Sequence, residues 1–259
     1  MVKDQLGRTL QLNTIPQRII SIVPSQTELL YELGLDETVV GITKFCIHPT
    51  AWFRQKKRVG GTKNINLETV RSLRPDIIFA NKEENTQSDI EQLTGICPVW
   101  VSDIQTFEDA MSMIEAVGTI VGKQTLACSM TMKLKSLQYT SLQKYPHSIS
   151  TLYLIWKNPY MAAGIDTFIN DMMRMAGFSN VIQQQRYPIL EMETLKQLQP
   201  SLVFLSSEPY PFKQKDIDAL QQIFPHAQLI LVDGELFSWY GSRLLKSFDY
   251  FSALHEQIH

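Results

Sequence analysis

The chain has 259 residues, of which 44% are hydrophobic and 19% charged, as expected for a globular protein with one large domain or two modest lobes. Acidic residues outnumber basic ones by 26 to 24, so the overall basic excess typical of nucleic-acid-binding proteins is absent. Three unevenly spaced cysteines argue against a disulfide framework and against a CxxC metal knuckle.

No stretch approaches the roughly 18 consecutive apolar residues that a membrane-spanning helix needs. The polar segment 1–8 shows no apolar core of a signal peptide. The sequence therefore predicts a periplasmic or cell-surface protein if a leader has been removed, and a cytoplasmic one otherwise.

Short β-branched runs alternate with amphipathic stretches, which is typical of an α/β fold with parallel sheets. The first strand is expected at 18–23, followed by a helix over 24–34 with Ser25 or Thr27 near its N-cap and Gly34 at its end. Further strands are expected at 39–42, 76–80, 99–102, 151–156, 202–205 and 229–232.

The segment 106–145 contains no proline and has glycine only at Gly118 and Gly122. Leu, Met, Lys and Gln recur at helical spacing over its later part, 123–144. We expect one long helix joining two lobes. The predicted organisation is an N-terminal lobe over 1–120, a linking helix over 121–145 and a C-terminal lobe over 146–259.

An internal repeat supports the two lobes. Residues 66–79 align without gaps with residues 191–204, with identical Glu, Thr, Leu, Pro and Phe. Each copy predicts a short helix that ends before a proline and leads into a buried strand. Two related lobes favour a ligand site in the cleft between them, beyond the carboxyl ends of the strands.

Common signatures of enzymes are absent from the sequence, including the GxSxG and GxGxxG motifs. The five histidines form no HxxxH pair, so no metal site built on several imidazoles is predicted. Cys46 and His48 could supply two metal ligands, although a buried thiol beside a turn histidine is the favoured interpretation. Whether either of them touches a metal is left open.

Five segments, taken in order, carry a resemblance to a known family: 18–30, 39–43, 60–68, 158–164 and 237–243. With the repeat and the helix, they resemble the substrate-binding proteins of bacterial metal-chelate ABC importers, the cobalamin and iron-siderophore class. The resemblance covers nearly the whole chain and is strongest to the cobalamin-binding members. It implies an α/β fold of two Rossmann-like lobes, with mostly parallel sheets, bridged by a single long helix.

The resemblance also implies which residues bind the ligand. Aromatic side chains would give a broad contact surface, and Arg243 could bind an amide or carboxylate edge. Tryptophans that are frequent in the cobalamin class are missing at Gly61–Lys63 and near Tyr187. The implied ligand-binding residues are Pro24, Ser25, Gln26, Phe45, His48, Gly61, Thr62, Lys63, Tyr160, Met161, Tyr187, Trp239, Tyr240 and Arg243.

In the resembling family, one glutamate on each lobe docks into arginine pockets of the membrane permease. The matching residues are Glu68 and Glu193, the glutamates of the repeat. Two exposed carboxylates could each bind a guanidinium in bidentate fashion. The alternative is that each is an acidic residue favoured in the first turn of a helix, with Asn66 as an N-cap.

The resemblance thus implies a monomeric, non-enzymatic protein that captures a metal chelate, with cobalamin or a related corrinoid favoured, and delivers it to an ABC permease. A ferric siderophore or haem is the alternative ligand. No catalytic residue, resident cofactor, protein-held metal or nucleic-acid partner is expected. Two other possibilities remain: an enzyme that uses Cys46 and His48, and a cytoplasmic chelate scavenger that contacts no permease.

Overall fold

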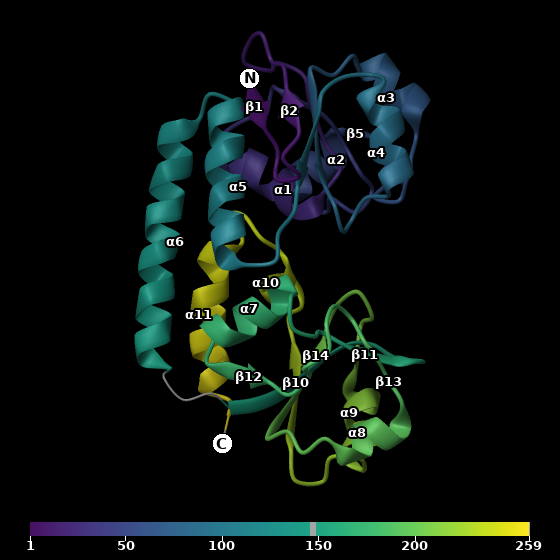
Figure 1. The fold of residues 1–259 in the computed structure, drawn as a ribbon, viewed down its shortest axis with the longest axis vertical. Helices are drawn as coiled ribbons and strands as arrows, with labels where there is room; N and C mark the ends of the chain where they lie inside the picture. Colours follow the sequence, from purple (N-terminus) through teal and green to yellow (C-terminus); the bar gives the residue numbers. More distant parts are fainter. Residues whose placement is uncertain (146–148, 259) are drawn as a thin grey trace. The chain divides into compact units, whose positions relative to one another are not determined.

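The computed structural model describes residues 1–145 and 149–258, and the chain divides into two compact units (Figure 1). The first unit holds residues 1–104, 108–133 and 240–243. The second holds 105–107, 134–239 and 244–259, of which 146–148 and 259 lie outside the described residues. The expected lobe boundaries at 120/121 and 145/146 stay a prediction, the second of them beside residues that are not described.

A five-stranded parallel sheet forms the centre of the first unit. Its central strands are buried along their length, because helices follow the strands in the chain and parallel sheets are covered on both faces. In sheet order the strands are β5 Lys57–Arg58, β4 Val39–Ile42, β3 Ile19–Ser21, β8 Ile77–Asn81 and β9 Val99–Ser102.

Four helices and two small hairpins complete the part of the first unit that precedes residue 104. The helices are α1 Pro24–Glu32, α2 Thr50–Gln55, α3 Leu67–Leu73 and α4 Gln87–Thr94. The hairpins pair β1 Val2–Lys3 with β2 Thr9–Leu10, and β6 Gly60–Gly61 with β7 Asn64–Ile65.

The expected N-cap of α1 is wrong, whereas its end is confirmed. Val23 is the N-cap residue, and Ser25 and Thr27 lie inside the helix. Proline is favoured in the first turn of a helix, because an N–H at that position would have no partner within the helix. With Pro24 as its first residue, the helix has its N-cap two residues before Ser25 and four before Thr27. At the other end, Gly34 has a φ of 74°, which a residue without Cβ adopts readily.

The segment 106–145 is not one continuous helix: it forms α5 Phe107–Ile120 and α6 Gln124–Lys144, the second of which lies within the linking helix expected over 121–145. Gly122 has a φ of 70°, and the Lys123 amide donates to the carbonyl oxygen of Gly118 at 2.7 Å, which closes α5. A Cβ at Gly118 would lie 2.3 Å from the Ala127 Cβ, so this glycine lets the two helices pack closely. The later part of the expected helix, α6, is present.

A six-stranded sheet forms the centre of the second unit. Its parallel strands are β10 Ile149–Trp156, β12 Phe178–Asn180, β14 Leu202–Ser206 and β15 Gln228–Val232. The strands β11 Tyr160–Ala162 and β13 Ile189–Leu190 add an antiparallel edge. Apolar side chains of the second unit make a buried core, among them Leu152, Leu154, Leu195, Val203, Leu205, Leu220 and Phe224.

Five helices belong wholly to the second unit: α7 Phe168–Met175, α8 Met192–Gln197, α9 Gln214–Gln221, α10 Glu235–Ser238 and α11 Leu244–His255. The repeat is confirmed as a structural unit, since α3 leads into β8 and α8 leads into β14. Among the described residues, no helix has the length and apolar character needed to cross a membrane.

Candidate functional site

The expected ligand-binding residues fall in both units, and each unit is described by itself. The first unit holds Pro24, Ser25, Gln26, Phe45, His48, Gly61, Thr62, Lys63, Tyr240 and Arg243. The second holds Tyr160, Met161, Tyr187 and Trp239.

At the carboxyl ends of β8 and β9, Gln26 enters a buried polar network. Its side-chain amide donates to the Ser102 hydroxyl at 2.6 Å and to the carbonyl oxygen of Ala80 at 3.2 Å. The Asn81 amide donates to the same hydroxyl at 3.0 Å. The Gln26 Oε1 is buried without a hydrogen-bond partner among the described residues. Asn81 and Ser102 were missed from the sequence, although Ser102 ends one predicted strand and Asn81 directly follows another.

Tyr240 is buried in the first unit, and its hydroxyl donates to Glu84 Oε1 at 3.3 Å. Burial and the nearby Glu84 carboxylate raise the pKa of Tyr240 well above its ordinary value. The phenol therefore stays neutral at physiological pH and serves as a hydrogen-bond donor.

Arg243 makes a buried ion pair with Glu28 of α1. Its Nε lies 2.7 Å from Glu28 Oε2 and its Nη2 lies 3.1 Å from Oε1, and both side chains are less than a tenth exposed. This bidentate geometry gives the guanidinium a partner within the protein. The expected contact of Arg243 with a ligand stays a prediction.

The loop after β4 and the β6–β7 hairpin lie against each other. A Cβ at Gly61 would lie 3.2 Å from the Phe45 ring, so the absence of a side chain there lets the ring approach. Phe45 is half exposed, and Lys44 Nζ lies 5.1 Å from its centroid. The carbonyl oxygen of Thr62 accepts from the Asn85 side chain at 2.8 Å. Phe45 and Gly61 thus lie in contact, and the role of Phe45, Gly61 and Thr62 in ligand binding stays a prediction.

The Cys46 thiol is a buried structural group. The Thr27 hydroxyl donates to its sulfur at 3.1 Å, and Thr43 Oγ1 lies 3.2 Å from it. Burial raises the pKa of this thiol, which disfavours the nucleophilic thiolate. His48, in the same loop, is half-buried. Among the described residues no group of three His, Cys, Asp or Glu side chains could hold a metal ion.

In the second unit, Trp239 is oriented by a carboxylate that sequence reasoning missed. Its indole N–H donates to Glu208 Oε1 at 3.0 Å, and the Ser238 hydroxyl donates to the same oxygen at 2.6 Å. Desolvation raises the pKa of Glu208, and the nearby Glu235 and Asp233 raise it further. A glutamate before a proline in a loop carries no pattern that would identify it.

Tyr160, Met161 and Tyr187 lie at the antiparallel edge of the second sheet. Tyr160 and Met161 belong to β11 and pair with Leu190 and Ile189 of β13, and Tyr187 lies two residues before β13. All three side chains are half-buried. Burial raises the pKa of Tyr160, so its hydroxyl remains protonated.

Glu68 and Glu193 occupy matching exposed positions, each the second residue of a short helix. Asn66 is confirmed as the N-cap of α3, since its side-chain oxygen accepts from the Thr69 amide at 2.9 Å. Glu191, the matching residue before α8, makes no such side-chain bond. Both glutamates therefore fit the first-turn preference, and their docking role stays a prediction.

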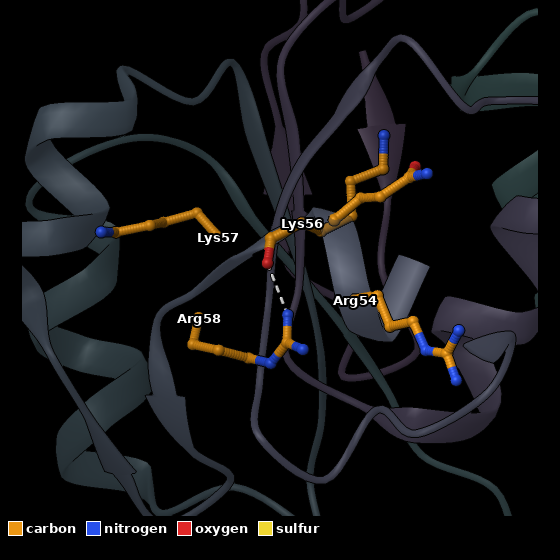
Figure 2. A pocket seen from close by; sticks show the side chains of 5 residues that line it. Arg54, Lys56, Lys57 and Arg58 are labelled. Atoms are coloured by element: carbon orange, nitrogen blue, oxygen red, sulfur yellow. Dashed lines mark hydrogen bonds between the residues drawn. The ribbon is translucent and has the colours of Figure 1, made fainter. Parts of the chain in front are cut away.

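Two surface hollows lie away from these residues. One, of about 430 Å³, is lined by Arg54–Arg58 in the first unit (Figure 2). The other, of about 760 Å³, lies in the second unit at the amino ends of β10, β14 and β15, with Lys196, Phe224 and His226 in its lining.

Two α/β units with polar and aromatic residues at strand ends define a solute-binding protein of the two-lobed type. The chain matches the profile of the periplasmic binding protein family over residues 19–223 and belongs to that family. The predicted class of protein, a substrate-binding component of an ABC importer and not an enzyme, is confirmed.

Similar proteins carry more specific names. YvrC of Bacillus subtilis, described as an ABC transporter substrate-binding lipoprotein, is 27% identical over 261 residues, which cover 95% of this chain and 82% of YvrC. A vitamin B12-binding protein of Pectobacterium carotovorum is 25% identical over 242 residues, covering 89% and 85% of the two chains.

Solved structures show the same fold. The periplasmic vitamin B12-binding protein BtuF of Vibrio cholerae has a TM-score of 0.79 and 19% identity, covering 94% of this chain and 98% of its own. A periplasmic haem-binding protein of Pseudomonas aeruginosa has a TM-score of 0.78 and 24% identity, covering 92% of each chain. The expected fold class is thereby confirmed.

Proposed function

We propose that this protein captures a metal chelate through residues at the strand ends described above and delivers it to the permease of an ABC importer. The observation that carries the proposal is the family match over residues 19–223, which includes most of the expected ligand-binding residues. The descriptions of the family as periplasmic and of YvrC as a lipoprotein favour an extracytoplasmic location over the cytoplasmic alternative.

A cobalamin-like corrinoid is the favoured ligand. Relatives similar over most of the chain are named vitamin B12-binding proteins. A corrin presents a broad, partly apolar face, to which aromatic side chains offer a large contact area. The half-exposed Phe45 and the half-buried Tyr160 and Tyr187 supply such side chains.

A negatively charged iron chelate, such as haem or a ferric siderophore, is the second candidate, and a separate observation favours it. Lys44 lies beside the Phe45 ring, and Lys63 is exposed at the β6–β7 turn. Residues 38–67 contain no acidic side chain. Carboxylates at the edge of a chelate would be attracted to these cations.

Equilibrium dialysis of the purified protein against cyanocobalamin tests the proposal, with haemin, a ferric siderophore and free Fe(III) in parallel cells. Retention of cyanocobalamin supports the favoured ligand, and retention of haemin or the siderophore alone moves the assignment to the second candidate. The F45A variant should weaken retention about tenfold, the loss of one good aromatic contact. Y139A, which truncates an exposed tyrosine of α6, should leave retention unchanged. Retention of none of the chelates would overturn the proposal.

A further inference from the structure

A stretch of the first unit is strongly basic although the whole chain is slightly acidic. The thirty residues 38–67 contain six Lys or Arg and no Asp or Glu, whereas the chain as a whole has 24 basic and 26 acidic residues. Four of the six lie within Arg54–Arg58, which covers the end of α2 and the strand β5. We call residues Arg54–Arg58 the basic corner.

Two cations of the basic corner are held in place by the protein. Lys56 Nζ lies 3.0 Å from Asp36 Oδ1 and 5.2 Å from the Trp52 ring. The Arg58 guanidinium lies 4.3 Å from the centroid of Phe53 and donates to the carbonyl oxygen of Lys56. Because these contacts fix the side chains, less conformational entropy is lost when an anion binds them.

The other two cations are exposed. The side chains of Arg54 and Lys57 form no hydrogen bond or ion pair with any described residue. Among the described residues, Asp36 is the one carboxylate that forms an ion pair with the basic corner, through Lys56. Four positive charges against one negative charge leave a net positive surface.

The side chains spread out and do not converge. Figure 2 shows Lys57 and Arg54 extending in opposite directions, with Lys56 and Arg58 between them, around the hollow of about 430 Å³. One small anion in the hollow could not contact all four cations at once. The arrangement fits an extended anionic surface whose charges can move to meet the side chains.

Protection of the sheet edge explains only part of this pattern. The strand β5 is an edge strand, and basic side chains on an edge discourage pairing with another chain. That role covers Lys57 and Arg58. Arg54 lies in α2, and Lys56 lies between helix and strand, so neither is needed for it.

We propose that the basic corner binds the surface of a lipid bilayer that contains anionic headgroups. Lys and Arg side chains near such a surface each contribute about 1 kcal/mol to binding, and the attraction falls off over a Debye length. Laterally mobile lipids can gather around the exposed charges of the basic corner, Arg54 and Lys57 above all, without any fixed spacing. This contact would hold the first unit against the membrane independently of chelate binding.

Co-sedimentation of the full chain with phosphatidylcholine vesicles, with and without phosphatidylglycerol, tests the proposal. Binding is expected to the phosphatidylglycerol vesicles alone and should weaken as salt rises. The R54A/K57A variant should bind them about 25-fold more weakly, from roughly 1 kcal/mol for each cation removed and 1.4 kcal/mol per tenfold change. R54K/K57R should bind as the wild type does.

The matched control is K196A/K215A, which removes two exposed cations from the second unit and changes the net charge equally. It should change binding less than twofold. Equal loss in both double variants would show general charge attraction and overturn the proposal, as would equal binding to pure phosphatidylcholine. Full displacement by millimolar pyrophosphate at constant ionic strength would assign a small-anion site and also overturn it. The chelate-dialysis assay reports separately on the proposed function.

Discussion

Glu28 and Arg243 are 215 positions apart in the sequence, yet they bind each other in the interior of the first unit. Removing two charges from water is unfavourable, and here the bidentate geometry offsets that loss. If one partner is removed, the other stays buried and loses this counter-charge. The free energy of unfolding should therefore fall more when one partner is replaced than when both are replaced together.

We expect R243M to lower the free energy of unfolding by about 3 kcal/mol, because the buried Glu28 carboxylate would lose its bidentate counter-charge. The double variant E28M/R243M should recover most of the loss, since neither charge then remains. Urea unfolding of the wild type, both single variants and the double variant measures the effect. Equal losses in the R243M and double variants would contradict a paired role for these residues.

Glu208 gives the second unit a pH-sensitive group at the indole of Trp239. Desolvation raises the pKa of this carboxyl, so the folded protein holds the proton to a higher pH than the unfolded chain does. The contribution of Glu208 to stability is therefore complete at low pH and is lost as pH rises through the raised pKa.

Replacement by Gln removes this titration but keeps an oxygen that can accept from Trp239 and Ser238. The stability of E208Q relative to the wild type should therefore increase as pH rises above about 4.3, the ordinary value for glutamate. Urea unfolding from pH 4 to 8 measures the difference. E37Q, which changes an exposed glutamate of the first unit, should show no such trend. A pH-independent difference for E208Q would contradict the expectation.

At the scale of elements, the repeat gives an internal control for helix capping. Asn66 caps α3 through its side chain, whereas Glu191 makes no cap bond at α8. N66A should lower the free energy of unfolding by about 1 kcal/mol, and E191A should change it much less. Thermal or urea unfolding of the two variants tests this. Equal losses would show that the Asn66–Thr69 bond contributes nothing measurable.

The break between α5 and α6 is a feature that helical periodicity did not predict. Helical spacing of Leu, Met, Lys and Gln over 123–144 and the lack of proline over 106–145 both predict helix, and neither signal marks the break near Gly118 and Gly122. Gly122 turns the chain because it adopts a φ of 70°, and Gly118 faces Ala127 of the next helix. Helical periodicity by itself therefore does not show where one helix ends and the next begins.

At the scale of the whole molecule, the docking role of Glu68 and Glu193 concerns transport and not ligand capture. If both glutamates bind arginines of the permease, the double charge reversal E68R/E193R should abolish chelate uptake by cells that carry the cognate permease. The affinity of the purified variant for its chelate should stay within twofold of the wild type.

An uptake assay in a strain lacking the chromosomal gene measures the first outcome, and equilibrium dialysis measures the second. E91R/D218R reverses two exposed acidic residues, one in each unit, and serves as the control. Normal uptake by E68R/E193R, or by E68A/E193A, would show that these residues are not the docking contacts.

Much of the fold could be predicted because strand and helix patterns are local. The expected strands at 39–42 and 99–102 match β4 and β9 residue for residue, and the repeat marked α3–β8 and α8–β14. A buried parallel strand is a short β-branched run bounded by turn residues, and that signal needs no distant contact. The family followed from such segments taken in order.

The partners of the polar side chains depended on the tertiary structure. Three contacts join residues that are distant in the sequence: the ion pair of Arg243 with Glu28, the hydrogen bond from Trp239 to Glu208, and the hydrogen bond from Gln26 to Ser102. A hydrogen bond depends on where the folded backbone places two groups, and no local pattern records that. The sequence by itself determined the elements, the repeat and the class of protein, because these rest on local hydrophobic periodicity and motif order. Only the tertiary structure decided which charges are buried and paired and which, as at Arg54 and Lys57, remain exposed.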